Sequence, residues 1–316
     1  MYGFGQQAVD GESLFLKIFS PSRRFPYFID EIFKILVEAK FVDRIKDLTY
    51  FDLGAGFGLM MIDGLLQGFN VYGTEPDPNS FSGRYNIAIR LAKEYGIDLE
   101  NRLYSCSGEN MYLLQKNIID VIYSYQVLEH VSNIKAVLEE TSRVLKLDGI
   151  AYFTMPNYNS FYEGHFETFW IPFILSKSKK ISKIYLKLIR KKTVYVDELN
   201  FTTPLKIRKI TEKIFHKDEI FIIPCGIKGL GFLSKYVYAI ELYNFYKALK
   251  IKNHNDIADY LKKNSRAINK LEKIPFINIF VKLYRIFFST TLLQPFITDF
   301  RLIIIRINNK DKKYKQ

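Results

Sequence analysis

Cysteine is almost missing from this chain, which has two, Cys106 and Cys225, among 316 residues. Two cysteines give neither a disulfide framework nor a cysteine-rich metal site. Long apolar runs are missing too: the best one, residues 286–298, is short and interrupted by a glutamine and a proline. It falls below the roughly 18 apolar residues of a membrane-spanning helix. The N-terminus also lacks a signal-peptide pattern. These absences predict a cytoplasmic protein.

Acidic residues are scarce in the second half of the chain. Residues 171–316 hold 31 Lys and Arg against 11 Asp and Glu, a net charge of +20, whereas residues 1–170 have −7. A basic half of this kind suits a partner with negative charge, either an anionic membrane surface or a nucleic acid.

A glycine-rich turn is the most informative feature that is present. An apolar segment near residues 50–53 contains Asp52 and is followed by Gly54, Gly56 and Gly58 at alternate positions. The pattern predicts a strand, a tight turn and a helix over residues 59–68. Glycine permits such a turn and lets a ligand approach the backbone closely. The spacing differs from the Gly-x-Gly-x-x-Gly of a dinucleotide fingerprint.

An acid follows the next predicted strand, residues 70–74. Glu75 stands 23 positions after Asp52 and directly before Pro76. This is close to the interval of roughly 20 residues at which an acid meets a ribose. A carboxylate can accept both ribose hydroxyls at once. The alternative is that Glu75 only caps the following helix.

The next 80 residues complete a strand–helix alternation. The apolar segment 118–124 is typical of a strand buried in a parallel sheet and leads into Tyr125 and Gln126. Ser132 is a predicted N-cap. The other predicted elements are a helix at about 79–95, a strand near 101–105, a helix over 132–146 and a strand over 150–154.

These segments resemble class I S-adenosylmethionine-dependent methyltransferases. The glycine-rich turn resembles motif I of that family. Residues 106–110 resemble its adenine-contacting motif, with Ser107 in place of the usual acid and Tyr112 in place of a proline. The sequence Leu-Glu-His-Val at 128–131 is similar to the segment after strand four of the ubiquinone- and menaquinone-type methyltransferases. The matches occur in the family's order across residues 50–157.

The resemblance implies an α/β fold: a Rossmann-like, doubly wound, mostly parallel sheet of seven strands with helical insertions. The last two strands are expected near residues 219–223 and 300–307, the last one antiparallel. It also implies S-adenosylmethionine as cofactor. The residues expected to bind it are Asp52, Gly54, Ala55, Gly56, Gly58, Glu75, Pro76, Ser107, Gly108, Glu109, Tyr125 and Gln126.

Four regions are expected along the chain. Residues 1–48 would form N-terminal lid helices, and residues 49–157 the S-adenosylmethionine-binding core. Residues 158–218 would supply a substrate loop and a basic amphipathic insertion. Residues 219–316 would hold the final strands, a second helical insertion and a basic tail.

Methyl transfer needs few side chains, because the donor is already activated and the protein aligns the reactants. A hydroxyl acceptor also needs a base. His165 is the favoured substrate-side residue, with Glu163 or Glu167 as its partner. His130, after strand four, is the second candidate, although it could simply order the turn. No metal site is predicted. The other two histidines, His216 and His254, are expected to face solvent.

Residues 169–192 are the densest basic region. An aromatic and apolar stretch that includes Trp170 precedes eight Lys and Arg between Lys177 and Lys192, with isoleucine and leucine at helical spacing. The pattern predicts a basic amphipathic helix that docks on anionic lipid with Trp170 inserted. The alternative is a helix packed on the core with its lysines in water. Residues 274–288 are a second candidate.

The favoured function is therefore O-methylation of a small or lipid-linked acceptor, such as a surface glycan or glycolipid precursor, at the inner membrane face. A tRNA or nucleic-acid methyltransferase is the main alternative, but the basic region is rich in Ile, Leu and Phe, which a phosphate-binding groove does not need. A non-catalytic binding module on the same fold is the third. The acceptor and the oligomeric state are left open by the sequence.

Overall fold

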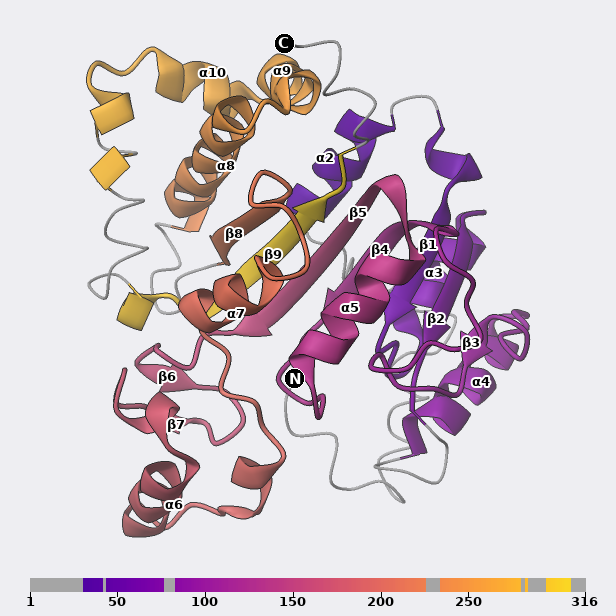
Figure 1. The fold of residues 1–316 in the computed structure, drawn as a ribbon, viewed down its shortest axis with the longest axis vertical. Coiled ribbons are helices and arrows are strands. Elements are labelled where there is room, and N and C mark those ends of the chain that lie inside the picture. The colour runs from indigo at the N-terminus through magenta and orange to yellow at the C-terminus, as the bar shows by residue number, and fades with distance from the viewer. Residues whose placement is uncertain are drawn as a thin grey trace.

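The computed structural model describes residues 31–41, 44–76, 83–225, 234–279, 282–283 and 294–307. These residues contain a seven-stranded sheet of order β3-β2-β1-β4-β5-β9-β8 (Figure 1). Its strands are β1 (Thr49–Leu53), β2 (Asn70–Thr74), β3 (Leu103–Tyr104), β4 (Ile119–Tyr125), β5 (Leu145–Pro156), β8 (Ile220–Cys225) and β9 (Asp299–Ile305).

The sheet has the expected directions. β1 pairs in parallel with β2 and β4, β2 with β3, and β4 with β5. β9 runs antiparallel to both of its neighbours, β5 and β8. The mostly parallel sheet with an antiparallel last strand is thus confirmed, and its last two strands lie where the sequence predicted them.

Helices cover both faces of the sheet, because successive side chains of a strand point to opposite faces. Tyr152 of β5 packs in one cluster with helices α2, α3, α4, α8 and α9. Phe153, the next residue, packs in the other with α5 and α7. The helices are α2 (Glu31–Lys40), α3 (Leu59–Leu66), α4 (Arg84–Glu94), α5 (Ile134–Val144), α6 (Lys179–Leu188), α7 (Pro204–Thr211), α8 (Ser234–Ile251), α9 (Asn255–Asn264) and α10 (Arg266–Glu272).

A small lobe extends from the C-terminal end of β5. It holds the hairpin of β6 (Tyr162–Glu163) and β7 (Thr168–Phe169), followed by α6, and lies below the sheet in Figure 1. Trp170 is fully buried in the lobe's own apolar cluster, and its indole N–H donates to the Tyr158 carbonyl (3.1 Å). The prediction that Trp170 inserts into a membrane is therefore wrong.

Two other details differ from the sequence-based expectation. The N-cap of α5 is Asn133, whose side chain accepts from the Lys135 and Ala136 amides, whereas Ser132 donates its amide to Glu109. His254 is partly buried rather than solvent-facing, since its Nε2 lies 3.0 Å from the Asp218 carbonyl. Most of the expected lid, residues 1–30, lies outside the described residues. No helix among the described residues is long and apolar enough to span a bilayer.

Candidate active site and cofactor pocket

Two buried carboxylates lie side by side at the ends of neighbouring strands. Asp52 is in β1, paired with Gly73 of β2, and Glu75 directly follows β2. Their exposed fractions are 5% and 8%. Glu75 Oε2 accepts a hydrogen bond from the Gly56 amide (2.7 Å), so the glycine-rich turn and the second strand end are joined. The structure brings the acid–glycine residues together as the sequence predicted.

Burial of the two acids in one pocket raises the pKa of both carboxyl groups. Burial, together with the charge of Glu75, raises the pKa of Asp52 to about 7. Burial also raises the pKa of Glu75, while the Gly56 amide and the Arg84 guanidinium oppose that rise. A cationic ligand would favour the ionised form of both acids. Arg84, at the start of α4, was not singled out from the sequence.

The glycines of the turn have different reasons to be glycine. Both Gly54 (φ +76°) and Gly56 (φ +57°) adopt left-handed backbone. A Cβ on Gly54 would stand 2.5 Å from Val127, so packing within the protein excludes a side chain there. Around the corresponding position of Gly56, no atom of the described residues lies within 4 Å. Gly56 therefore borders open space at the acid pair, where a ligand can contact the backbone.

These residues fit S-adenosylmethionine. Its amino group and sulfonium are cationic and match two buried acids, and its ribose hydroxyls are donors for a carboxylate at the end of β2. Gly58 is the N-cap residue of α3, and the Ala55 amide donates to the Thr74 carbonyl (2.7 Å), which holds the turn against β2.

Glu75→Ala is expected to weaken the binding of S-adenosylhomocysteine about ten- to a hundred-fold. The loss of charge-assisted hydrogen bonds to the ribose costs roughly 1.5–3 kcal/mol. Isothermal titration calorimetry measures it, with the melting temperature as the check on folding. Glu75→Gln keeps the shape and should lose less. Wild-type affinity in a folded Glu75→Ala protein would show that the ribose binds elsewhere.

The segment expected to contact adenine, residues 106–110, makes some of its contacts within the protein. Glu109 Oε1 accepts from the Ser132 amide (2.7 Å) at the start of α5. A Cβ on Gly108 would stand 3.0 Å from Leu53, so the loop lies against β1. The Glu109 carboxylate thus holds the α5 end. An adenine contact through Ser107 and the backbone of this loop stays a prediction.

The residues after β4 lead from the cofactor pocket to the histidines. Gln126 has a left-handed backbone (φ +55°), and its Nε2 donates to Asp299 Oδ1 (3.2 Å). Both residues line a hollow of about 20 Å³ together with Glu163 and His165. That volume suits roughly one water-sized group, such as a hydroxyl. Tyr125 and Pro76 are exposed, and their contact with cofactor stays a prediction.

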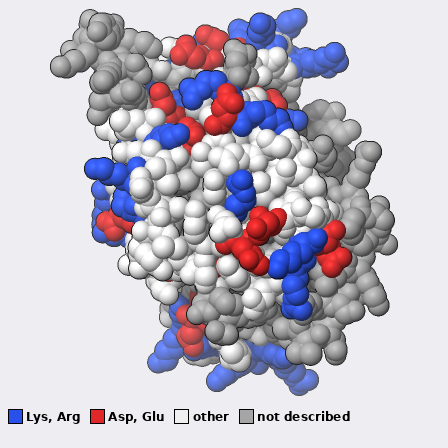
Figure 2. All heavy atoms as spheres, turned by 90° about the vertical axis from the view of Figure 1, so that its right-hand side faces the viewer, with Lys and Arg blue, Asp and Glu red and all other residues white. Residues whose placement is uncertain are grey.

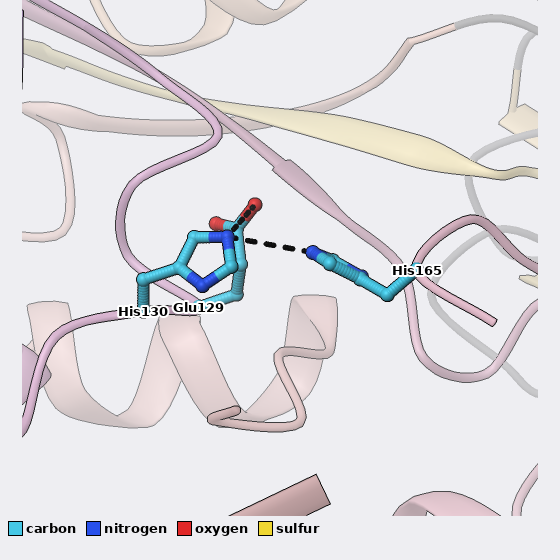
Figure 3. Close-up of side chains that lie close together, drawn as sticks. All are labelled: Glu129, His130 and His165. Atoms are coloured by element: carbon cyan, nitrogen blue, oxygen red, sulfur yellow. Dashed lines mark hydrogen bonds and ion pairs between the residues drawn. The ribbon is translucent and has the colours of Figure 1, made fainter. Parts of the chain in front are cut away.

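The two histidines that the sequence singled out, His130 and His165, lie next to each other (Figure 3). The Nε2 atoms of His130 and His165 are 3.4 Å apart, and His165 Nδ1 is 2.7 Å from Glu163 Oε1. Of the two predicted partners, Glu163 is therefore the one that pairs with His165. Desolvation by the surrounding protein, His165 and Arg84 lower the pKa of His130 to about 4, although its side chain keeps an exposed fraction of 46%.

Glu129 is a site residue that the sequence reasoning did not assign, although it stands in the quoted Leu-Glu-His-Val segment. Its side chain is fully buried, and burial raises its pKa well above the usual range. Possible ligand atoms of Glu129, His130 and His165 all lie within 4.8 Å of one another. The structure thus brings together three side chains that could hold a cation, an arrangement that the sequence did not predict.

Part of the chain is similar in sequence to known methyltransferases. Residues 51–153 match the family model described as a methyltransferase domain. The ubiquinone biosynthesis O-methyltransferase of Rickettsia canadensis (strain McKiel) is 28% identical over 148 residues. That match covers 47% of this chain and 56% of the Rickettsia protein, so the chain spans little more than half of the relative's length.

Comparison with solved structures finds one of the same fold and a second with weaker similarity. Phosphoethanolamine N-methyltransferase 2 of Haemonchus contortus, in complex with phosphomonomethylethanolamine and S-adenosylhomocysteine, has a TM-score of 0.50 at 14% identity. The similarity covers 98% of this chain and 61% of that one. Geranyl diphosphate C-methyltransferase of Streptomyces coelicolor A3(2) has a TM-score of 0.42 at 15% identity, with 85% and 77% covered. Residues 51–153 therefore match a methyltransferase domain, and the sheet that contains them has the strand order of the Rossmann-like methyltransferase fold.

Proposed function

We propose that this protein transfers the methyl group of S-adenosylmethionine to a hydroxyl oxygen of a small or lipid-linked acceptor. The observation that carries the proposal is the Glu163–His165 pair, which reaches His130 beyond the end of β4. Ligands of such sheets bind beyond the carboxyl ends of the strands. An imidazole held by a carboxylate at that place has the arrangement of a general base for a hydroxyl.

Glu163 fixes which nitrogen of His165 carries the proton. Its Oε2 accepts from the Phe166 amide (2.7 Å), and its Oε1 faces His165 Nδ1. We assign the Nδ1 proton to this hydrogen bond, because a carboxylate is a strong acceptor. His165 Nε2 is then unprotonated, and it takes the proton of the acceptor hydroxyl as the oxygen bonds to the methyl carbon.

The rest of the pocket positions the reactants. S-adenosylmethionine, when bound, supplies a methyl group that is already activated. Asp52 and Glu75 bind the cationic and ribose parts, and the hollow beside Gln126 and Asp299 holds the hydroxyl near His165. Alignment of this kind is the main contribution that methyl transfer requires of a protein.

A basic cavity favours an acceptor that carries phosphate, such as a glycan or glycolipid precursor. It measures about 420 Å³ and lies where α6 and α7 begin, next to Lys177, Lys179 and Lys206. No carboxylate is among its described lining residues. Phe201 of this cavity lies 4.7 Å, ring to ring, from Tyr158, whose hydroxyl is 3.3 Å from His165 Nδ1. The cavity is therefore close to His165, the proposed base.

The outer face of α6 supports a membrane-facing setting. The inner face is anchored, since Ser182 and Leu186 are buried. Ile184 and Leu188 point outward with exposed fractions of 53% and 78%. Exposed lysines and arginine accompany them: Lys180, Lys187, Arg190, Lys191 and Lys192. An apolar face with cations around it is typical of a helix at an anionic bilayer surface.

Reversing three charges on this face, Lys180→Glu, Lys187→Glu and Lys191→Glu, is expected to abolish flotation with anionic liposomes. Each lysine contributes about 1 kcal/mol near such a surface before screening. Lys183 is left unchanged because it pairs with Asp197. The matched control is Lys209→Glu, Lys213→Glu and Lys217→Glu, which changes net charge equally and should still float. Equal flotation of both triple variants would show that α6 does not dock on lipid.

Methyl transfer itself is tested with purified protein and S-adenosylmethionine that carries a labelled methyl group. Acceptors to compare are polyprenyl-phosphate-linked sugars, nucleotide sugars, quinol precursors and tRNA. We expect label in an O-methyl product of one of the first three, located by mass spectrometry. Label in a nitrogen or carbon position, or no label with any acceptor, would contradict the proposal.

A nucleic-acid substrate is the second function class to compare. A phosphate-tracking surface is expected to be a continuous basic field. Figure 2 shows the side of the molecule that carries β3 and α4, and on this side blue and red side chains stand next to each other, so this one face has no such field among its described residues. Label in tRNA would nevertheless replace the small-acceptor proposal, and S-adenosylhomocysteine binding without any transfer would favour a binding module.

A further inference from the structure

The three side chains in Figure 3 approach one another from separate parts of the chain. Glu129 and His130 follow β4, whereas His165 lies in the β6–β7 hairpin. His130 Nε2 is 3.4 Å from His165 Nε2 and 4.0 Å from Glu129 Oε1. All three ligand atoms lie within 4.8 Å of one another.

Glu129 is the part of this cluster that needs an explanation. Its side chain has an exposed fraction of 0%, and neither carboxylate oxygen has a hydrogen-bond partner among the described residues. A buried carboxylate that accepts no hydrogen bond is unfavourable. One oxygen lies 4.0 Å from the His130 Nε2 atom, and imidazole is the commonest metal ligand in proteins.

His165 is oriented as a metal ligand usually is. Its Nδ1 lies 2.7 Å from Glu163 Oε1, and Glu163 is itself held by the Phe166 amide. Metal-bound histidines nearly always donate their other ring N–H to such a carboxylate. The lone pair of His165 Nε2 then points toward His130.

The separations suit one cation. Zinc binds histidine nitrogen and carboxylate oxygen at about 2.1 Å, so that two tetrahedral ligands lie about 3.4 Å apart. The Nε2–Nε2 distance of 3.4 Å agrees with this value. The Glu129 oxygen lies 4.0 Å from His130 Nε2 and no more than 4.8 Å from the His165 ligand atom, so it would have to move inward by about 0.6 Å or more to reach the tetrahedral separation.

We propose that Glu129, His130 and His165 bind one divalent transition-metal ion, with Glu163 as the residue that positions His165. Two imidazoles and a carboxylate suit zinc and its neighbours, and three protein ligands leave a position open. The binding site stands on its own geometry. Its use rests on the proposed function: the open position would take the acceptor hydroxyl, and the cation would lower the pKa of that hydroxyl, so that its proton passes to solvent water and its oxygen takes the methyl group.

Cobalt(II) is the probe, because it occupies zinc sites and has visible absorption bands that report coordination. The full-length protein is treated with chelator, dialysed and titrated with Co²⁺, with calorimetry in parallel. We expect one bound equivalent and bands of a four- or five-coordinate site. Glu129→Gln and His165→Gln should abolish these bands, and Glu163→Gln should lower affinity about ten- to a hundred-fold.

His216→Ala is the matched control, since His216 is an exposed histidine next to Asp218 and far from this cluster in sequence. It should bind Co²⁺ as the wild type does, and S-adenosylhomocysteine affinity shows that each variant is folded. No saturable binding of one equivalent, or unchanged binding in both Glu129→Gln and His165→Gln, would overturn the metal site. Methyl transfer is scored separately: a protein that binds Co²⁺ as expected but methylates nothing refutes the proposed function alone.

Discussion

His165→Ala is expected to lower kcat for methyl transfer by about 10²- to 10⁴-fold, the usual contribution of a positioned acid–base group. Activation of the hydroxyl depends on His165 Nε2, whether that atom accepts the proton or holds a cation that acidifies the hydroxyl. The cofactor pocket is built from β1, β2 and the turn at Gly56, so S-adenosylhomocysteine affinity should not change.

Single-turnover rates with labelled S-adenosylmethionine measure this effect. Glu163→Gln should lose less rate than His165→Ala, because Glu163 positions the imidazole and does not touch the acceptor. His216→Ala should keep the wild-type rate. A wild-type kcat in His165→Ala would show that the β6–β7 hairpin takes no part in catalysis. His130 would then be the one remaining histidine at the site.

Gly56→Val is expected to weaken S-adenosylhomocysteine binding by at least about 100-fold, that is by roughly 2.7 kcal/mol or more. Left-handed backbone costs an L-residue roughly 1–2 kcal/mol, and valine is among the least tolerant. The larger effect is steric, because the isopropyl group would occupy the open space beside the acid pair.

Gly68→Val separates these two causes. Gly68 also has left-handed backbone (φ +77°), and no atom of the described residues lies within 4 Å of where its Cβ would stand. It follows α3, away from the acid pair. Both variants should lose a similar amount of thermal stability, but only Gly56→Val should lose cofactor binding in calorimetry. Equal affinity in the two variants would mean that the turn does not border the ligand.

The core could be predicted from the sequence because its signals are local. A few consecutive residues are enough to identify an apolar strand, glycines at a turn or an acid at a strand end. The parallel pairing of β1 and β2 then brings Asp52 and Glu75 together. Helix α4 begins at Arg84, later than the predicted start near 79, and residues 77–82 lie outside the described part.

The histidine cluster depends on contacts that are distant in sequence. His165 meets His130 across 35 positions through a hairpin that no local pattern fixes in space. In the sequence, Glu129 is only one residue of the Leu-Glu-His-Val segment. The structure shows that its carboxylate is buried and accepts no hydrogen bond among the described residues, so it needs a cation or a hydrogen-bond donor. Trp170 misled the prediction because an aromatic residue beside lysines suits a membrane surface and a small apolar core equally well.

The position of β9 has a consequence for the order of folding. β9 lies between β5 and β8, and among the described strands β8 pairs with β9 alone. The 73 residues between Cys225 and Asp299 are synthesised before β9 can form. At about 5–20 residues per second the ribosome needs roughly 4–15 s for them. During that time the edge of β5 and the apolar β8 segment are both unpaired, so nascent chains are most prone to aggregate, and most dependent on chaperones, in this interval.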